Sequence, residues 1–213
     1  MVHLTCAAMI VAVSVLAGAP ARPEAGRPAP ERAKIQAYLA THDVPSSADL
    51  KALAPIPETA LIAIASDAAV EKLTRARAVA ALRLLPSPAV QEFLSKLIES
   101  KATTTDETLR LLLRRAAVAL GWMAGSDAPD QLALLFENED EDVRLDAVLG
   151  ISMSRAANAA ETLRKRLAVE SSPRVRQQIE RQLVTLAGPA PEPAKAPGSK
   201  KQPPARQPMR GGF

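Results

Sequence analysis

The residue types that most often carry enzyme chemistry are scarce in this chain of 213 residues. It contains two histidines, His3 and His42, and one cysteine, Cys6. Histidine is the usual general base and, with cysteine, the usual ligand of zinc, and both roles need several such groups brought together. We therefore expect neither histidine-based nor thiol catalysis, and no zinc site. The sequence predicts a protein that is not an enzyme and uses no cofactor.

The richest cluster of carboxylates is the stretch Glu137–Asp142, in which five of the six residues are acidic. Such a cluster could bind calcium, but it lacks the glycine and the distal glutamate of a regular calcium loop. Acidic residues just before a helix also complement the positive end of the helix dipole. We expect these side chains to cap a helix and to form no metal site.

Arg164, Lys165 and Arg166 form the one basic cluster in the central part of the chain. They are either a solvated helix face or a contact for an acidic partner. The candidate interaction surface consists of Gln91, Gln131, Arg164 and Lys165. We expect Trp122, which follows Gly121, to be a packing wedge between helices rather than a platform for a ligand.

The elements that would position these residues are helices with a repeated pattern. Val143, Ala147 and Ile151 recur at every fourth residue, one stripe of a helix, and Leu163 follows twelve residues later on a second helix. The frame recurs at Thr74, Ala78, Leu82 and Leu94, at Leu112, Ala116, Leu120 and Leu132, and at Val175, Ile179 and Leu183. The third positions are 38, 31 and 32 residues apart, a period typical of helix-pair repeats.

The starts of four helices carry N-cap signals. Each is a serine or threonine followed by a proline or, three residues later, by a carboxylate: Ser46 with Asp49, Ser87 with Pro88, Thr104 with Glu107, and Ser172 with Pro173. The last helix is expected to end near Ala187. Lys195 stands where the fourth frame would have its partner leucine, so the array ends there.

The pattern resembles HEAT repeats of the short bacterial type over residues 47–187. The resemblance rests on Val143-Arg144 with Ala147, on Leu120-Gly121, on the run from Thr74 to Leu82 and on Val175-Arg176. It implies an all-α fold, a right-handed α-α superhelix of about four helix pairs. HEAT repeats serve as scaffolds, adaptors and regulatory modules and, more rarely, as lyase or nucleic-acid-processing subunits.

The arginine position of the family pattern shows one departure. Arg75, Arg144 and Arg176 fill it in three units, but Leu113 fills it in the second unit. An internal ladder of arginines would therefore be interrupted there.

The amino-terminal residues predict export. Leu4–Ala19 is an apolar run of sixteen residues, and Ala19-Pro20-Ala21 fits the small-x-small rule for cleavage before Arg22. Residues 1–21 are thus expected to be a secretory signal, and the mature protein to be secreted or periplasmic. The alternative is a retained anchor, but the run is shorter than the roughly 20 apolar residues that a bilayer needs, so no stable membrane span is expected.

Proline content and charge set the remaining boundaries. Residues 22–46 are expected to be a Pro-rich linker with a short helix, residues 47–187 the repeat domain and residues 188–213 a disordered tail. Residues 47–188 carry 18 basic against 19 acidic side chains, so the net charge of +4 belongs mainly to the tail. This balance argues against nucleic-acid binding. The tail could make weak contacts with anionic envelope polymers or lipid.

These observations favour an exported protein-interaction scaffold or adaptor. In this interpretation the second helices of successive pairs line a common face that binds another protein or peptide. The alternative is a cytoplasmic regulatory or lyase-type HEAT-like protein that acts on a modified partner and keeps its first 21 residues.

Overall fold

The computed structural model describes residues 29–41, 45–123, 125 and 127–188. Within these residues the fold is all helical and has no strand, as the sequence predicts. None of the helices described is long and apolar enough to cross a bilayer. The elements are α1 (Pro30–Thr41), α2 (Ser47–Leu53), α3 (Pro57–Ser66), α4 (Lys72–Leu82), α5 (Pro88–Lys101), α6 (Glu107–Met123), α7 (Ala128–Ala133), the 3-10 helix η1 (Leu134–Glu137), α8 (Glu141–Ser154), α9 (Ala159–Val169) and α10 (Pro173–Ala187). The predicted signal segment and residues 189–213 lie outside the described part.

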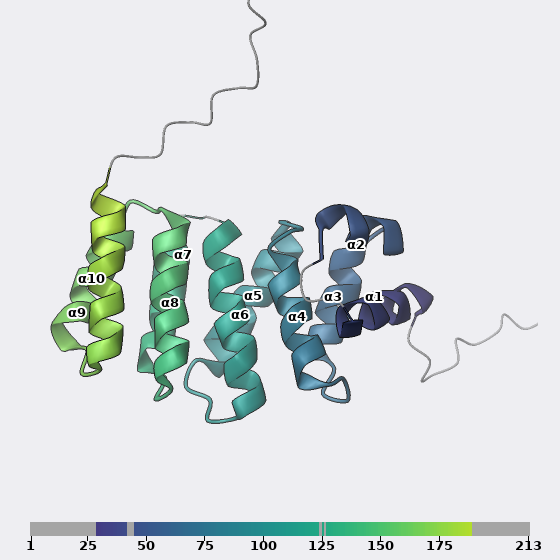
Figure 1. The fold of residues 1–213 in the computed structure, drawn as a ribbon, viewed down its shortest axis with the longest axis horizontal. Coiled ribbons are helices and arrows are strands. Elements are labelled where there is room, and N and C mark those ends of the chain that lie inside the picture. Colours follow the sequence, from purple (N-terminus) through teal and green to yellow (C-terminus); the bar gives the residue numbers. More distant parts are fainter. Residues whose placement is uncertain (1–28, 42–44, 124, 126, 189–213) are drawn as a thin grey trace, which may run out of the picture.

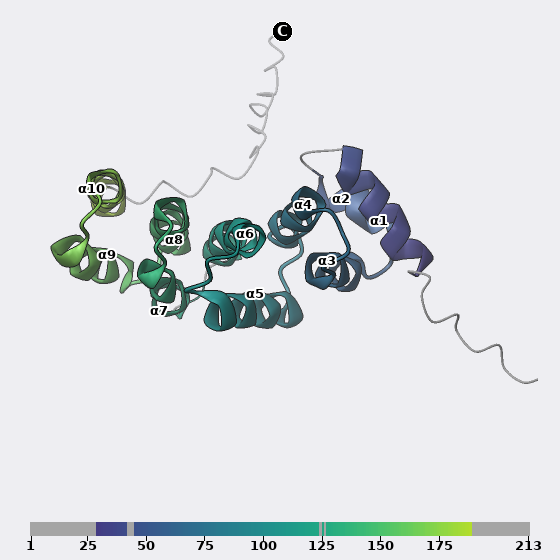
Figure 2. The same cartoon turned by 90° about the horizontal axis from the view of Figure 1, so that it is seen from below.

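The helices from α3 onward form two rows (Figures 1 and 2). The first row contains α4, α6, α8 and α10, each packed on the next, and the second row contains α3, α5, α7 and α9. The main contacts across the rows join α3 to α4, α5 to α6, α7 to α8 and α9 to α10. The sequence frame joined each first-row helix to the helix after it. Packing joins it to the helix before it, because the short turn at 83–87 leads α5 beneath α6 (Figure 2).

The predicted core positions are buried. Leu94, Leu132 and Leu163 are all 0% exposed, and they lie in the second row. The first-row positions of the four frames are buried too, except Leu183, which is partly buried against the core. The many alanines among them leave little side-chain bulk between neighbouring helices, so the helices can pack closely.

Helices α6 and α8 approach each other very closely at two glycines. A Cβ atom added to Gly121 would lie 2.6 Å from the Cα of Gly150, and a Cβ on Gly150 would lie 3.0 Å from the carbonyl carbon of Ala117. Carbon atoms at such distances overlap, because the optimum is about 3.5–4.0 Å. The two backbones are therefore in direct contact, and only hydrogen fits at either position.

Three of the four predicted helix caps are present. Ser46, Ser87 and Ser172 accept hydrogen bonds from the backbone N–H groups at the starts of α2, α5 and α10. The capping box expected for Thr104 and Glu107 is wrong. The cap of α6 is Asp106, whose carboxylate accepts from the N–H of Leu109 at 2.7 Å, while Thr104 accepts from the N–H of Asp106.

The first helix contributes to the same core as the later ones. α1 packs against α3 and α4, and its Ile35 and Leu39 are 0% exposed. The guanidinium of Arg77 in α4 donates to the carbonyl oxygens of Leu39 and Ala40, at 2.9 and 3.2 Å. The short helix expected within residues 22–46 is therefore fixed to the helices that follow it.

Candidate functional site

The acidic stretch Glu137–Asp142 caps a helix, as predicted. The carboxylate of Asp140 accepts hydrogen bonds from the N–H groups of Asp142 and Val143, at 2.8 and 3.2 Å, and so begins α8. Asn138 is buried, and its amide donates to the carbonyl oxygen of Ala102 at 2.6 Å. Such bonds satisfy backbone groups that a helix end leaves without an intrahelical partner.

Carboxylates at the start of α8 and within it form ion pairs with arginines. Asp142 lies 2.8 Å from Arg174 and 3.2 Å from Arg114, and Asp146 lies 2.8 Å from Arg114. Burial acts to lower the pKa of Arg114, but the neighbouring carboxylates outweigh it and raise that pKa. Within the described residues, no group of three or more His, Cys, Asp or Glu side chains is placed to hold a metal ion.

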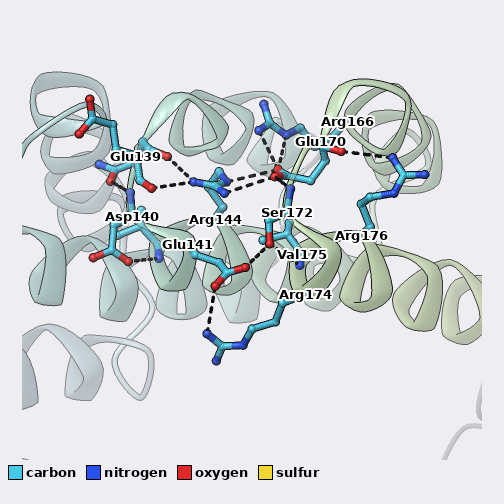
Figure 3. Close-up of polar contacts among 12 residues, drawn as sticks. Glu139, Asp140, Glu141, Arg144, Arg166, Glu170, Ser172, Arg174, Val175 and Arg176 are labelled. Atoms are coloured by element: carbon cyan, nitrogen blue, oxygen red, sulfur yellow. Dashed lines mark hydrogen bonds and ion pairs between the residues drawn. The ribbon is translucent and has the colours of Figure 1, made fainter.

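Among the described residues, the most deeply buried ionic cluster is centred on Glu170, between α9 and α10 (Figure 3). Its carboxylate lies 3.3 Å from Arg144 of α8 and 2.7 Å from Arg166 of α9. It also accepts from the N–H of Ser172, at 2.9 Å. The Glu170 side chain is 0% exposed and that of Arg144 is 11% exposed. The cluster joins α8 and α9 to the turn that begins α10.

Glu170 is held in its charged form. Burial acts to raise the pKa of this carboxyl, but the hydrogen bonds from Ser172, Arg166 and Arg144 outweigh burial and hold the pKa below its usual value. A general acid or base needs a pKa near the working pH and access to a substrate. Glu170 has neither, so the cluster is a structural contact and not an acid–base site.

In three of the four pairs, an arginine of the second helix donates to carbonyl oxygens at the end of the first helix or in the turn that follows it. Arg75 of α4 donates to Ala65 at 3.0 Å, and Arg176 of α10 to Leu167 at 2.8 Å. Arg144 of α8 donates to Asn138 and Glu139 at 2.8 and 2.9 Å (Figure 3). The last carbonyls of a helix have no intrahelical partner, and a cation there also complements the dipole.

In the second unit, where Leu113 replaces the arginine, Arg110 makes the corresponding contact from one helical turn earlier. Leu113 is 0% exposed and lies in the core, so it cannot make the contact. Arg110 of the same helix donates instead to the carbonyl oxygen of Thr104, after α5, at 3.1 Å, and lies 3.8 Å from Asp140. The predicted interruption thus exists in the sequence pattern, while Arg110 provides the same contact to the α5/α6 pair.

Replacing Arg110 with methionine should destabilise the chain by about 1–2 kcal/mol, because the change removes a charge-assisted hydrogen bond and keeps most of the aliphatic stem. Chemical denaturation measures the loss. The matched control is Arg115→Met, on the exposed side of the same helix, which should leave the midpoint nearly unchanged. Equal effects of the two substitutions would contradict the role assigned to Arg110.

The basic cluster at 164–166 is divided by the fold. Arg164 is exposed, and Lys165 is exposed and pairs with Glu161 at 2.8 Å. Arg166 turns inward instead, to Glu170, and its guanidinium lies 5.3 Å from the centre of the Phe136 ring. Three consecutive helical residues point in different directions, about 100° apart, so the run cannot act as one basic patch.

The two glutamines of the candidate surface lie in the second row. Gln91 is exposed on α5. Gln131 of α7 is half-buried and accepts a hydrogen bond from the hydroxyl of Ser95, at 2.9 Å. Gln131 therefore links α5 to α7. The four candidate residues lie on three separate helices, α5, α7 and α9.

The first row carries a groove of about 400 Å³ between α4 and α6, which the sequence interpretation missed. Its floor includes Ala76 and Ala119, which are buried. Its sides are formed by partly exposed apolar side chains and by arginines. The complete lining is Leu73, Ala76, Arg77, Ala80, Arg83, Leu111, Arg115, Val118 and Ala119.

Trp122 lies at the end of α6, beside this groove. It is 60% exposed, and the guanidinium of Arg83 lies 5.8 Å from the centre of its ring. Trp122 also lines a second hollow of about 540 Å³, which it shares with Met153 of α8, with Arg155 just after α8 and with Leu186 of α10. The expected packing wedge is wrong, because Gly121 occupies the position that faces α8 and leaves Trp122 on the surface.

Comparison with known proteins gives no match: no protein-family model, no curated protein and no solved structure is significantly similar to this chain. The groove and the polar clusters themselves are therefore the features that indicate a function.

A sequence signal for the groove exists. Leu73, Arg77 and Ala80 are spaced i, i+4, i+7, and Leu111, Arg115 and Val118 have the same spacing on the next first-row helix. Each set forms a second stripe on its helix, beside the core stripe. Each second stripe combines two apolar residues with an arginine, and such a mixture on the side away from the core is a signal for a binding surface.

Proposed function

We propose that this chain is a protein-interaction scaffold without catalytic activity of its own. The groove between α4 and α6 carries the proposal, because it combines partly exposed apolar side chains with arginines on one face. Binding sites for other molecules are concave and mostly apolar, with a few polar groups that fix orientation. The conspicuous acidic and buried ionic clusters support the same proposal, since their members serve as helix caps or as contacts between helices.

The proposed architecture is a HEAT-like right-handed superhelix. It is supported by the repeated frame, by the two helix rows and by the arginine contact that recurs from pair to pair. In such an array each unit contacts only its neighbours, and the rows provide long surfaces for a partner.

The proposed location is outside the cytoplasm. It is supported by the apolar run Leu4–Ala19 and by the Ala19-Pro20-Ala21 cleavage signal, which lie outside the described residues. If the signal is cleaved, the intact mass of the protein purified from its native host should correspond to a chain that starts at Arg22. A mass that includes Met1–Ala21 would contradict export by this route.

Site-specific photo-crosslinking in the native host tests the scaffold proposal. A photoreactive residue would replace Val118 in the groove or, as a second site, Gln91 in the second row. A scaffold should give discrete protein adducts from at least one of these positions. Absence of an adduct from both positions, in a chain shown to be folded and correctly located, would contradict the scaffold function.

A further inference from the structure

The groove between α4 and α6 has a shape that suits a helix. Its lining along α4 runs from Leu73 to Arg83, the residue that follows the helix, about 15 Å at 1.5 Å per residue. Small side chains line the middle, where Ala76, Ala80 and Ala119 leave room between larger apolar neighbours. A segment of about ten helical residues matches this length.

The groove is also positively charged. Arg77, Arg83 and Arg115 line it, and its lining contains no carboxylate. Arg77 is engaged by the carbonyl oxygens at the end of α1. Arg83 and Arg115, in contrast to Arg114, Arg144 and Arg174, make no ion pair within the described part of the chain. Two cations beside an apolar groove would complement an acidic ligand.

The chain's own tail does not fit this groove. Residues 189–213 contain five basic side chains and one acidic one, so the arginines would repel them. An extended peptide from another protein is also a poor fit. Extended peptides that bind by strand addition need a sheet edge, and the described residues form no sheet. Proline-rich extended peptides bind grooves lined by aromatic side chains, and the lining of this groove contains none. A helix satisfies its own backbone and presents only side chains.

We propose that this groove binds an acidic amphipathic helix of a partner protein. This inference rests on the proposed scaffold function and adds the chemistry of the partner. The apolar face of the helix packs over the alanines between α4 and α6, and its carboxylates pair with Arg83 and Arg115. Trp122 lies at the edge of the contact and is the only tryptophan in the chain, so its fluorescence reports on occupancy.

The test uses the full mature chain and two synthetic helical peptides in buffer of physiological ionic strength. One peptide has leucine and alanine on one face and glutamate on the other, and the second has lysine in place of each glutamate. The acidic peptide should bind saturably and shift the emission of Trp122. The double variant R83E/R115E should weaken this binding about tenfold or more, because it replaces two attractive contacts with repulsive ones.

The specific control reverses the charge of the peptide and the charge of the groove together. The lysine peptide should bind R83E/R115E more tightly than it binds the unmodified chain. The variant R164E/K165E, which changes the exposed basic pair on α9, should bind the acidic peptide as the unmodified chain does. The milder variant R83Q/R115Q, which adds no repulsion, should give an intermediate loss and keeps the test valid if R83E/R115E proves unstable.

Three results would overturn the assignment: no saturable binding of the acidic peptide, binding that R83E/R115E leaves intact, or an equal loss from R164E/K165E. The crosslinking experiment separates this failure from failure of the scaffold function. Adducts from Gln91 but not from Val118 would leave a scaffold that uses the second row, whereas adducts from neither would remove both proposals.

Discussion

Replacing Glu170 with glutamine should destabilise the chain by about 3–5 kcal/mol. Removing one partner of a buried ion pair leaves the other charge without compensation in a medium that solvates it poorly. Here the change would leave Arg144 nearly buried and without its carboxylate, and would weaken the pair with Arg166 and the bond to Ser172. Urea unfolding of the two chains at neutral pH measures the difference as a shift in midpoint at constant slope.

The same helix offers a matched control. Glu161 also pairs with a basic residue four positions away, Lys165, but both of these side chains are mostly exposed, at 66% and 76%. Exposed pairs of this kind contribute little, so Glu161→Gln should leave the midpoint unchanged. Equal losses from the two substitutions would mean that burial does not decide the strength of the Glu170 cluster.

The Glu170 cluster should also make the stability of the folded chain depend on pH in the acidic range. The pKa of this carboxyl is lower in the folded chain than its usual value of 4.5, so the folded state binds its proton less readily than the unfolded state does. Its contribution is complete above about pH 4.5 and is lost as the pH falls through the folded pKa. Below pH 4.5 the difference in stability between the chain and Glu170→Gln should therefore shrink. A difference that stays constant down to full acid unfolding would contradict this linkage.

The core positions of the fold could be predicted from the sequence because they depend on the local spacing of apolar residues. Val143, Ala147 and Ile151 are one turn apart on a helix, and a stripe at that spacing has to face other apolar surface whatever the topology. The helix caps were mostly readable for the same reason, since a cap and its N–H partner lie within three residues. The cap predicted at Thr104 was wrong because Asp106, two residues later, has a carboxylate, which is a stronger hydrogen-bond acceptor, and caps the helix instead.

Contacts between distant residues were not readable in this way. Arg144 and Glu170 are 26 positions apart, and nothing in the residues around Glu170 shows which arginine it meets. The sequence frame paired each first-row helix with the helix after it, whereas the fold pairs it with the helix before it. The error arose because a spacing of twelve residues is compatible with either partner. Arg110 was missed because Leu113 occupies the position that holds arginine in the other three units, and only the fold shows that a side chain one turn earlier reaches Thr104.

The groove was missed for a different reason. Leu73, Ala80, Leu111 and Val118 are apolar, and an interpretation directed at the core assigns such residues to the interior. Their partial exposure follows from the two-row packing, because each first-row helix buries one stripe against its own row and the second row. The side chains Leu73, Ala80, Leu111 and Val118 lie on the other side of their helices and stay at least partly exposed.

Replacing Gly150 or Gly121 with alanine should destabilise the chain by about 3 kcal/mol or more. In an ordinary helix the same substitution is stabilising by about 1 kcal/mol, because alanine has the higher helix propensity. At Gly121 and Gly150 the effect of the substitution on stability should have the opposite sign. The new methyl group would overlap the backbone of the neighbouring helix, and backbone cannot move aside as a flexible side chain can. Relief of the overlap would separate α6 from α8 in the middle of the row.

Gly188 provides the control for these substitutions. It follows α10 with a φ of −66°, and a Cβ there would meet no atom closer than 3.4 Å, so Gly188→Ala should be close to neutral. The double variant G121A/G150A provides a second test. Once α6 and α8 have separated to admit one methyl group, the second meets less resistance, so the two losses should sum to more than the loss in the double variant. Thermal and urea unfolding of the three single variants and the double variant measure these terms. Stabilisation by either Gly121→Ala or Gly150→Ala would show that the two helices are further apart than the backbone contact between them requires.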